Sequence, residues 1–175
     1  MFEQNLLSTS KKELALFCEL QQLLDIFAYN YLRKMIRLTK VFRFETAHAI
    51  HGYNGQCKDI HGHSYVLHAT VAGQTNNNDY IPAPGFIFDF KDLKKAGVEI
   101  IETLDHKLVL SRDYIAAHPE ITNHANVVIW DFEPTAENIL LYVKGVFLRN
   151  LPDEIKLVQL KIYETENSYA EWVAD

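Results

Sequence analysis

Residues 42–65 read FRFETAHAIHGYNGQCKDIHGHSY, and this stretch decides the fold because it holds two alternating patterns separated by a polar loop. Successive side chains of a strand point to opposite faces, so residues two apart share a face. One face of a first strand carries Phe42, Phe44, Thr46 and His48. One face of a second strand, from about His61 to Gly73, carries His61, His63, Tyr65, Leu67, Ala69 and Val71. The pattern predicts a β-hairpin closed by the polar loop HGYNGQCKD at 51–59.

The three histidines of this hairpin form a candidate metal site. On a strand, the imidazoles of His61 and His63 point the same way, and a hairpin would bring His48 to them. Three neutral imidazoles with one open position are the ligand set of a catalytic zinc site, where the metal acts as a Lewis acid. The alternative is ordinary surface or core histidine, since the chain has 8 histidines in 175 residues.

Cys57 lies four positions before His61, in the loop of the hairpin. As a fourth ligand it would close the site into a structural one. As a free thiolate, acidified by the nearby cation, it would serve as a base or nucleophile. An inert buried thiol fits so polar a loop poorly. The spacing leaves the ligand and the base interpretations open.

The rest of the chain predicts two helices and two further strands. TNNND at 75–79 indicates a turn, 85–90 a short strand, Lys91–Leu104 a helix and Ser111–Asn126 a loop before the apolar run Val127–Trp130. Pro134 and Thr135 open a second helix, with Thr135 as its N-cap. A strand with Val158, Leu160, Ile162 and Glu164 on one face and the strand SYAEWV at 168–173 close the chain. We expect an α+β fold of order ββααββ, with an antiparallel four-stranded sheet, two helices on one face, and edges that favour self-association.

Residues 1–34 predict a separate N-terminal amphipathic helical extension, and residues 35–175 the folded domain. Ser10 and Glu13 form a capping-box pattern at the start of this helix, although Met35 is an alternative start of the protein. The net charge of −6, without a Lys/Arg-rich block, disfavours nucleic-acid and anionic-membrane partners. No apolar run has the length of a membrane span, no secretory signal is recognisable, and two cysteines suit a reducing cytoplasm.

Six motifs occur in an order that resembles one known family. They are FRFETAH, CKDIHGHSY, FDFKDLK, LDHKLVL, PTAEN and KIYETENSYAEW. From about Ile36 to Val173 the chain is similar to the 6-pyruvoyltetrahydropterin synthase / 6-carboxytetrahydropterin synthase family. The resemblance implies the tunnelling fold (T-fold), in which subunits join their sheets into a barrel, typically as a homohexamer of two trimers.

The resemblance also implies the roles of the site residues. Zinc would be bound by His48, His61 and His63. Cys57 would be the catalytic base, completed by Asp105 and His106 of a neighbouring subunit. Glu164 would anchor the pterin ring, because one carboxylate accepts both the ring N–H and the exocyclic amine. Thr135 and Glu137 would be secondary pterin contacts, although helix capping and first-turn charge explain them equally well.

Two activities of this family share one substrate, 7,8-dihydroneopterin triphosphate. The chain resembles the carboxy synthases of 7-deazaguanine (queuosine) biosynthesis in having three residues between Cys57 and HGH, and in an Asp-Phe pair at Asp89-Phe90. We therefore expect a zinc-dependent 6-carboxy-5,6,7,8-tetrahydropterin synthase, a lyase. The alternatives are a 6-pyruvoyltetrahydropterin synthase, a zinc- and pterin-binding module without catalysis, and a structural zinc protein. The loop 111–126, with His118 and His124, has no counterpart role in the family.

Overall fold

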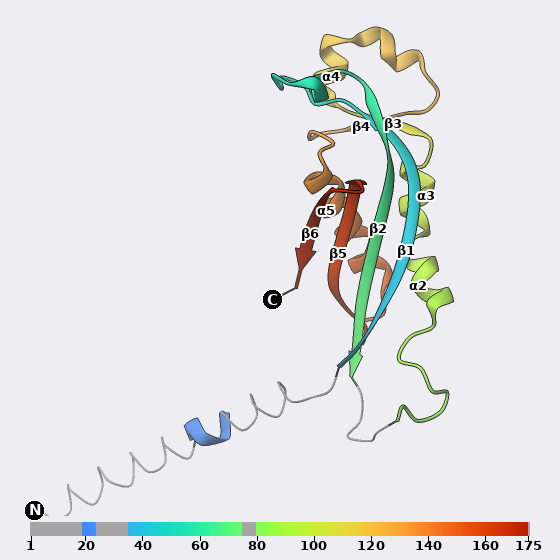
Figure 1. Ribbon diagram of the computed structural model, residues 1–175, viewed down its shortest axis with the longest axis vertical. Helices are drawn as coiled ribbons and strands as arrows, with labels where there is room; N and C mark the ends of the chain where they lie inside the picture. The colour runs from blue at the N-terminus through green and yellow to red at the C-terminus, as the bar shows by residue number, and fades with distance from the viewer. Residues whose placement is uncertain (1–18, 24–34, 75–79, 175) are drawn as a thin grey trace, which may run out of the picture.

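The computed structural model describes residues 19–23, 35–74 and 80–174. A long β-hairpin is the central element of the fold (Figure 1). The strands are β1 (Met35–His48), β2 (His61–Gln74), β3 (Lys107–Ser111), β4 (Val127–Trp130), β5 (Lys156–Thr165) and β6 (Ser168–Val173). The helices are α2 (Phe90–Ala96), α3 (Val98–Leu104), α4 (Arg112–Ala117) and α5 (Ala136–Asn150), with 3-10 turns η1 (Gln56–Lys58) and η2 (Pro119–Asn123).

The hairpin of β1 and β2 is confirmed, and its register fixes the candidate site. The two strands pair along their whole length, with His48 opposite His61 and Thr46 opposite His63. Phe42, Phe44, Thr46 and His48 are buried, whereas the residues between them are more exposed, as the alternating pattern predicts. A shift of one residue in this register would turn the histidines of one strand to the opposite face.

The sheet has six strands in the order β4-β3-β1-β2-β5-β6, so the expected four-stranded antiparallel sheet is wrong in its strand number. β1, β2, β5 and β6 are antiparallel neighbours, as expected. β3 adds to β1 in parallel, and β4 adds to β3 in parallel. These two strands come from short apolar runs, and a short apolar run does not by itself reveal whether it forms a strand.

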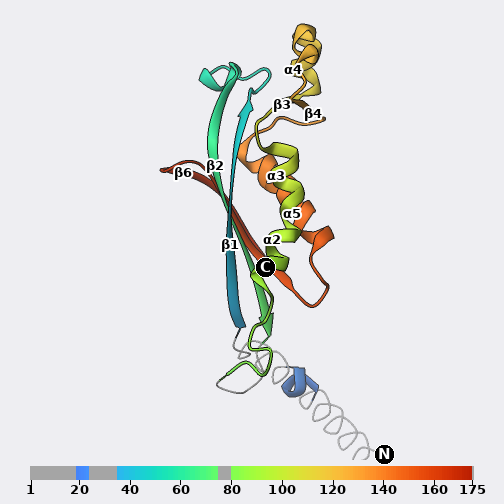
Figure 2. The same cartoon turned by 90° about the vertical axis from the view of Figure 1, so that its right-hand side faces the viewer.

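Helices α2, α3 and α5 cover one face of the sheet (Figure 2). The single helix expected over Lys91–Leu104 is two helices, because Gly97 interrupts it. A Cβ at Gly97 would lie 2.7 Å from the ring of Phe42 and 3.0 Å from that of Phe147, so the helix approaches the core closely at this point. The aromatic rings of Phe42 and Phe147 pack edge to face there, at 5.8 Å between centroids.

Two other segment predictions are wrong. Residues 85–90 are not a strand: Asp89 is the N-cap of α2 and accepts a hydrogen bond from the Lys91 N–H, while Ile87 and Phe88 pack on the core. The segment Ser111–Asn126 is not a loop but contains α4 and η2. The Ser111 hydroxyl caps α4 by accepting from the Tyr114 N–H, and the buried Tyr114 joins a second small apolar cluster.

The predicted N-terminal amphipathic helix lies outside the described residues, apart from residues 19–23, which are helical. The turn predicted at 75–79 also lies outside them. No helix within the described ranges is long and apolar enough to cross a membrane.

Candidate active site

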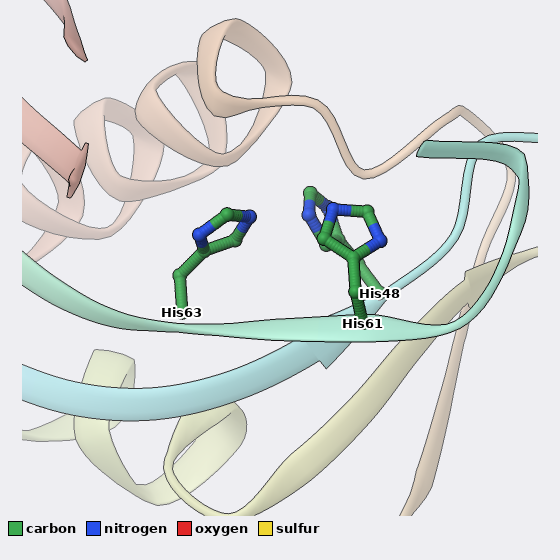
Figure 3. Close-up of side chains that lie close together, drawn as sticks. All are labelled: His48, His61 and His63. Atoms are coloured by element: carbon green, nitrogen blue, oxygen red, sulfur yellow. The ribbon is translucent and has the colours of Figure 1, made fainter. Parts of the chain in front are cut away.

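The β1–β2 register brings His48, His61 and His63 together on the face of the sheet that the helices cover (Figure 3). One nitrogen from each ring lies within 4.8 Å of the corresponding nitrogens of the other two. The ring centroids of His48 lie 4.5 Å from His61 and 5.2 Å from His63. This triad, which we call the histidine triad, can hold one metal ion.

Backbone carbonyls orient two of the three rings. His48 Nδ1 lies 2.6 Å from the Pro134 carbonyl oxygen, and His61 Nδ1 lies 2.8 Å from the Asp59 carbonyl oxygen. A carbonyl can only accept, so Nδ1 carries the proton in both rings and Nε2 keeps a free lone pair. Metal-binding histidines usually donate their other ring N–H in this way, which fixes the tautomer and the ring orientation.

His48 Nε2 provides the strongest test of the fit to a metal. Among the described residues, it is the one buried side-chain nitrogen or oxygen without a hydrogen-bond partner. Leaving such an atom unpaired costs about 1–3 kcal/mol, so an unpaired buried atom needs an explanation. A metal ion between the three rings would engage this lone pair, and the donor set fits zinc.

The electrostatics of His48 also suit a ligand. Burial lowers the pKa of His48 below its ordinary value of 6.5, and the imidazoles of His61 and His63 lower it further, against the raising effects of the Pro134 carbonyl and Glu164. The ring is therefore neutral at pH 7, which is the protonation state that binds a metal.

Glu164 lies beside the triad, near the end of β5. Its Oε1 accepts a hydrogen bond of 2.9 Å from the Tyr65 hydroxyl and lies 4.0 Å from Nε2 of both His48 and His63. Tyr65 is fully buried, and burial, followed by the charge of Glu164, raises its pKa, so the phenol remains a donor at neutral pH. The sequence placed Tyr65 on this face but predicted no role for it.

Cys57 lies in η1, in the loop between β1 and β2, and is exposed. Its sulfur is not part of the metal-binding group that the three histidines form. This geometry favours a free thiol over a fourth ligand. The Ile50 N–H donates to the Cys57 carbonyl at 2.8 Å, and the next N–H, of His51, donates to the Glu133 carboxylate at 2.8 Å. Glu133 thus ties the Cys57 loop to the segment before α5, a contact across 82 residues that no sequence pattern predicted.

Asp105 and His106 form a pair at the end of α3, with His106 Nδ1 3.0 Å from Asp105 Oδ2. The Glu45 N–H donates to Asp105 Oδ1 at 2.9 Å and lowers the pKa of Asp105, as does the His106 side chain. His106 has φ +57°, and no other non-glycine residue in the described ranges has a positive φ. Such a conformation is uncommon and often marks functional sites.

The His106 side chain is 80% exposed and, within residues 35–74 and 80–174, makes no hydrogen bond to Cys57. An open cavity of ≈ 360 Å³ lies beside the hairpin, and its lining includes Glu45, His63, His106 and Lys107 but not Cys57. One chain therefore brings Glu164 to the triad but does not bring His106 to its own Cys57.

Thr135 is the N-cap of α5, its hydroxyl accepting from the Asn138 N–H at 3.3 Å, and Glu137 lies in the first turn of that helix. These positions match the capping interpretation and assign neither residue to a ligand. The segment leading into α5 matters to the site through two other groups, the Pro134 carbonyl and the Glu133 carboxylate.

Comparisons with known proteins identify the family and the fold of the chain. Residues 37–175 match the family profile described as 6-pyruvoyl tetrahydropterin synthase. A protein of Rickettsia bellii named 6-carboxy-5,6,7,8-tetrahydropterin synthase is 33% identical over 144 residues, covering 78% of this chain and 99% of its own. The protein of that name from Haemophilus influenzae is 28% identical over 145 residues, covering 79% and 99%. The structure of Caenorhabditis elegans 6-pyruvoyl tetrahydropterin synthase superposes with a TM-score of 0.58 at 20% identity, over 82% of this chain and 98% of that one. This last similarity shows a common fold.

Proposed function

This chain belongs to the 6-pyruvoyl tetrahydropterin synthase family and is an enzyme of that type, and from this premise we propose that it is a zinc-dependent 6-carboxy-5,6,7,8-tetrahydropterin synthase. It would convert 7,8-dihydroneopterin triphosphate and water into 6-carboxytetrahydropterin, acetaldehyde and triphosphate. The product would enter 7-deazaguanine (queuosine) biosynthesis in the cytoplasm. The observation that carries the proposal is the histidine triad with its unpaired buried Nε2 beside Glu164.

His48, His61 and His63 would hold the zinc ion. Bound there, zinc supplies Lewis-acid polarisation of the substrate side-chain oxygens, which makes the neighbouring carbon-bound protons more acidic. Glu164 would bind the pterin ring with both carboxylate oxygens: Oε2 is free, and Oε1 keeps a second lone pair beside the bond from Tyr65, so two adjacent N–H donors can be accepted.

Cys57, Asp105 and His106 would carry out the proton transfers. Cys57, as a thiolate, would remove a carbon-bound proton from the substrate side chain. His106, whose Nδ1 donates to Asp105, would present Nε2 as the group that gains or gives a proton. Because His106 does not reach the Cys57 of its own chain, we propose that the two come from neighbouring copies in a homohexamer. The exposure of both side chains supports this arrangement.

The choice of product rests on two observations. Three residues separate Cys57 from His61, and relatives at about one-third identity over most of the chain are named carboxy synthases. Incubation of the zinc-loaded protein with 7,8-dihydroneopterin triphosphate, followed by mass spectrometry, tests it. We expect 6-carboxytetrahydropterin with acetaldehyde. Release of 6-pyruvoyltetrahydropterin would instead assign the pyruvoyl activity, and absence of turnover would contradict an enzymatic role.

Substitution of Cys57 distinguishes its role as a catalytic base from a role as a fourth metal ligand. Cys57→Ala should retain one zinc per chain, because the sulfur lies outside the histidine triad, and should lose turnover by at least about 100-fold, the scale of general-base catalysis. Metal content by atomic emission and product formation are measured on the same sample. Loss of zinc from this variant would contradict the assignment of Cys57 as base.

A further inference from the structure

Tyr65 is the buried residue that links the histidine triad to Glu164. It follows His63 by two positions on β2, so both side chains lie on the same face of the sheet. Its ring is fully buried, stacks on Phe44 at 5.3 Å and meets the rings of His48 and His63 edge-on at 6.3 and 5.4 Å. Packing on all sides fixes the hydroxyl at one place, 2.9 Å from Glu164 Oε1.

Glu164 is in a position that permits two different uses of its carboxylate. Its Oε1 lies 4.0 Å from Nε2 of His48 and 4.0 Å from Nε2 of His63. Zinc binds carboxylate oxygen at about 2.0–2.2 Å, and an ion between these rings would be within reach of a small rotation of the side chain. Glu164 can therefore serve as a fourth ligand or accept from a bound molecule, but a carboxylate turned onto the metal no longer presents both oxygens to two adjacent N–H donors.

Backbone pairing around Glu164 does not fix the orientation of its carboxylate. The pairing of β2 with β5 ends at Tyr163, and the pairing of β5 with β6 is irregular between Tyr163 and Thr165. Glu164 sits in this irregularity with a side chain that is 26% exposed. The Tyr65 hydroxyl is the one hydrogen-bond donor that reaches its carboxylate from the described residues.

We propose that Tyr65 is a positioning residue that holds Glu164 away from the metal and aimed at the pterin ring. The inference rests on the proposed function, since it takes Glu164 as the pterin acceptor. The phenol engages Oε1, the oxygen nearest the triad, and leaves Oε2 and a second lone pair on Oε1 for the ligand. By keeping the carboxylate out of the coordination shell, Tyr65 preserves the open position that a catalytic metal site requires.

The test is Tyr65→Phe, which keeps the buried ring and removes only the hydroxyl. Cobalt(II) in place of zinc reports coordination through its visible absorption, and neopterin serves as a fluorescent pterin probe. In Tyr65→Phe we expect a changed cobalt spectrum as Glu164 enters the shell. We also expect neopterin to bind about 10- to 100-fold more weakly, the scale of a hydrogen bond to a charged group. Turnover should show a higher KM with a smaller change in kcat.

Two further variants make the test specific. In Tyr65→Phe combined with Glu164→Gln, the amide binds metal poorly, so the cobalt spectrum should return to that of the native protein. Tyr163→Phe removes a hydroxyl from the adjacent residue of β5, whose ring contacts Tyr169 at 5.1 Å, and should change neither readout. If the native protein binds neopterin and Tyr65→Phe matches it in spectrum and affinity, the positioning role is refuted. If the native protein does not bind neopterin, the proposed function fails, and this inference fails with it.

Discussion

The proposed zinc site predicts that His63→Ala removes most of the stabilisation that zinc binding would give to the folded protein. At a free zinc concentration 100 times Kd, binding stabilises the native state by about 2.7 kcal/mol. For a domain of this size each kcal/mol is worth about 2–4 °C, so Tm should rise by about 5–11 °C. Removing a residue that only orients a metal ligand lowers metal affinity by up to about 100-fold. Removing one of the three ligands should lower zinc affinity by at least that factor. At the same zinc concentration about 0.4 kcal/mol remains, a shift of about 2 °C or less.

The assay is thermal unfolding followed by circular dichroism, with zinc and again after chelation. His63 suits the test because its side chain is 18% exposed and its Nδ1 is not tied to a backbone carbonyl as in His48. His68→Ala is the matched control: it lies on the same strand, on the opposite face, with its ring 5.5 Å from Tyr163. The control should show the full shift. Equal zinc shifts in His63→Ala and the native protein would refute the assignment of the triad as the metal site.

Two other perturbations probe the surroundings of the triad. Glu133→Ala should lower kcat about two- to tenfold at unchanged zinc content, because the His51 N–H loses its acceptor and the Cys57 loop loses its hydrogen bond to the segment before α5. Glu133→Gln keeps an acceptor oxygen and should largely restore kcat. In the metal-free protein, the free energy of unfolding should fall between pH 7.5 and 5.5, by at most about 1.4 kcal/mol per pH unit from His48. Burial holds the pKa of His48 below 6.5, so the unfolded chain takes up the proton first; a slope unchanged in His48→Phe, measured by urea unfolding, would contradict this.

The parts of the fold that sequence predicted correctly are those with local patterns. The alternation from Phe42 to His48, followed by a polar loop, determined the hairpin and the meeting of the three histidines. Thr135 marked the start of α5 because an N-cap acts within one turn. Ser111 carried the same signal for α4, but the many polar residues after it favoured a loop.

The parts that sequence missed depend on contacts between distant segments. β3 and β4 are short, and each becomes a strand only by joining a parallel neighbour that arrives after a long crossover. The alternation before α2 resembled a strand, yet Asp89 caps the helix instead. Glu133 meets His51 across 82 residues, and Tyr65 meets Glu164 across 99, so neither partner was visible in the neighbouring sequence.

The proposed metal ligands lie in regular strand pairing, whereas the proposed substrate-contacting residues lie where that pairing ends. His48 and His61 are opposite each other in a continuous ladder, and carbonyls fix both rings, which suits ligands that must converge on one ion. Cys57 and Glu164 lie where regular pairing stops, one in a loop and one at a strand irregularity, and each depends on a single distant tether. Groups that must contact a substrate and then release it need such adjustable supports. The tethers, Glu133 and Tyr65, are therefore the positions at which substitution should alter turnover while leaving the metal bound.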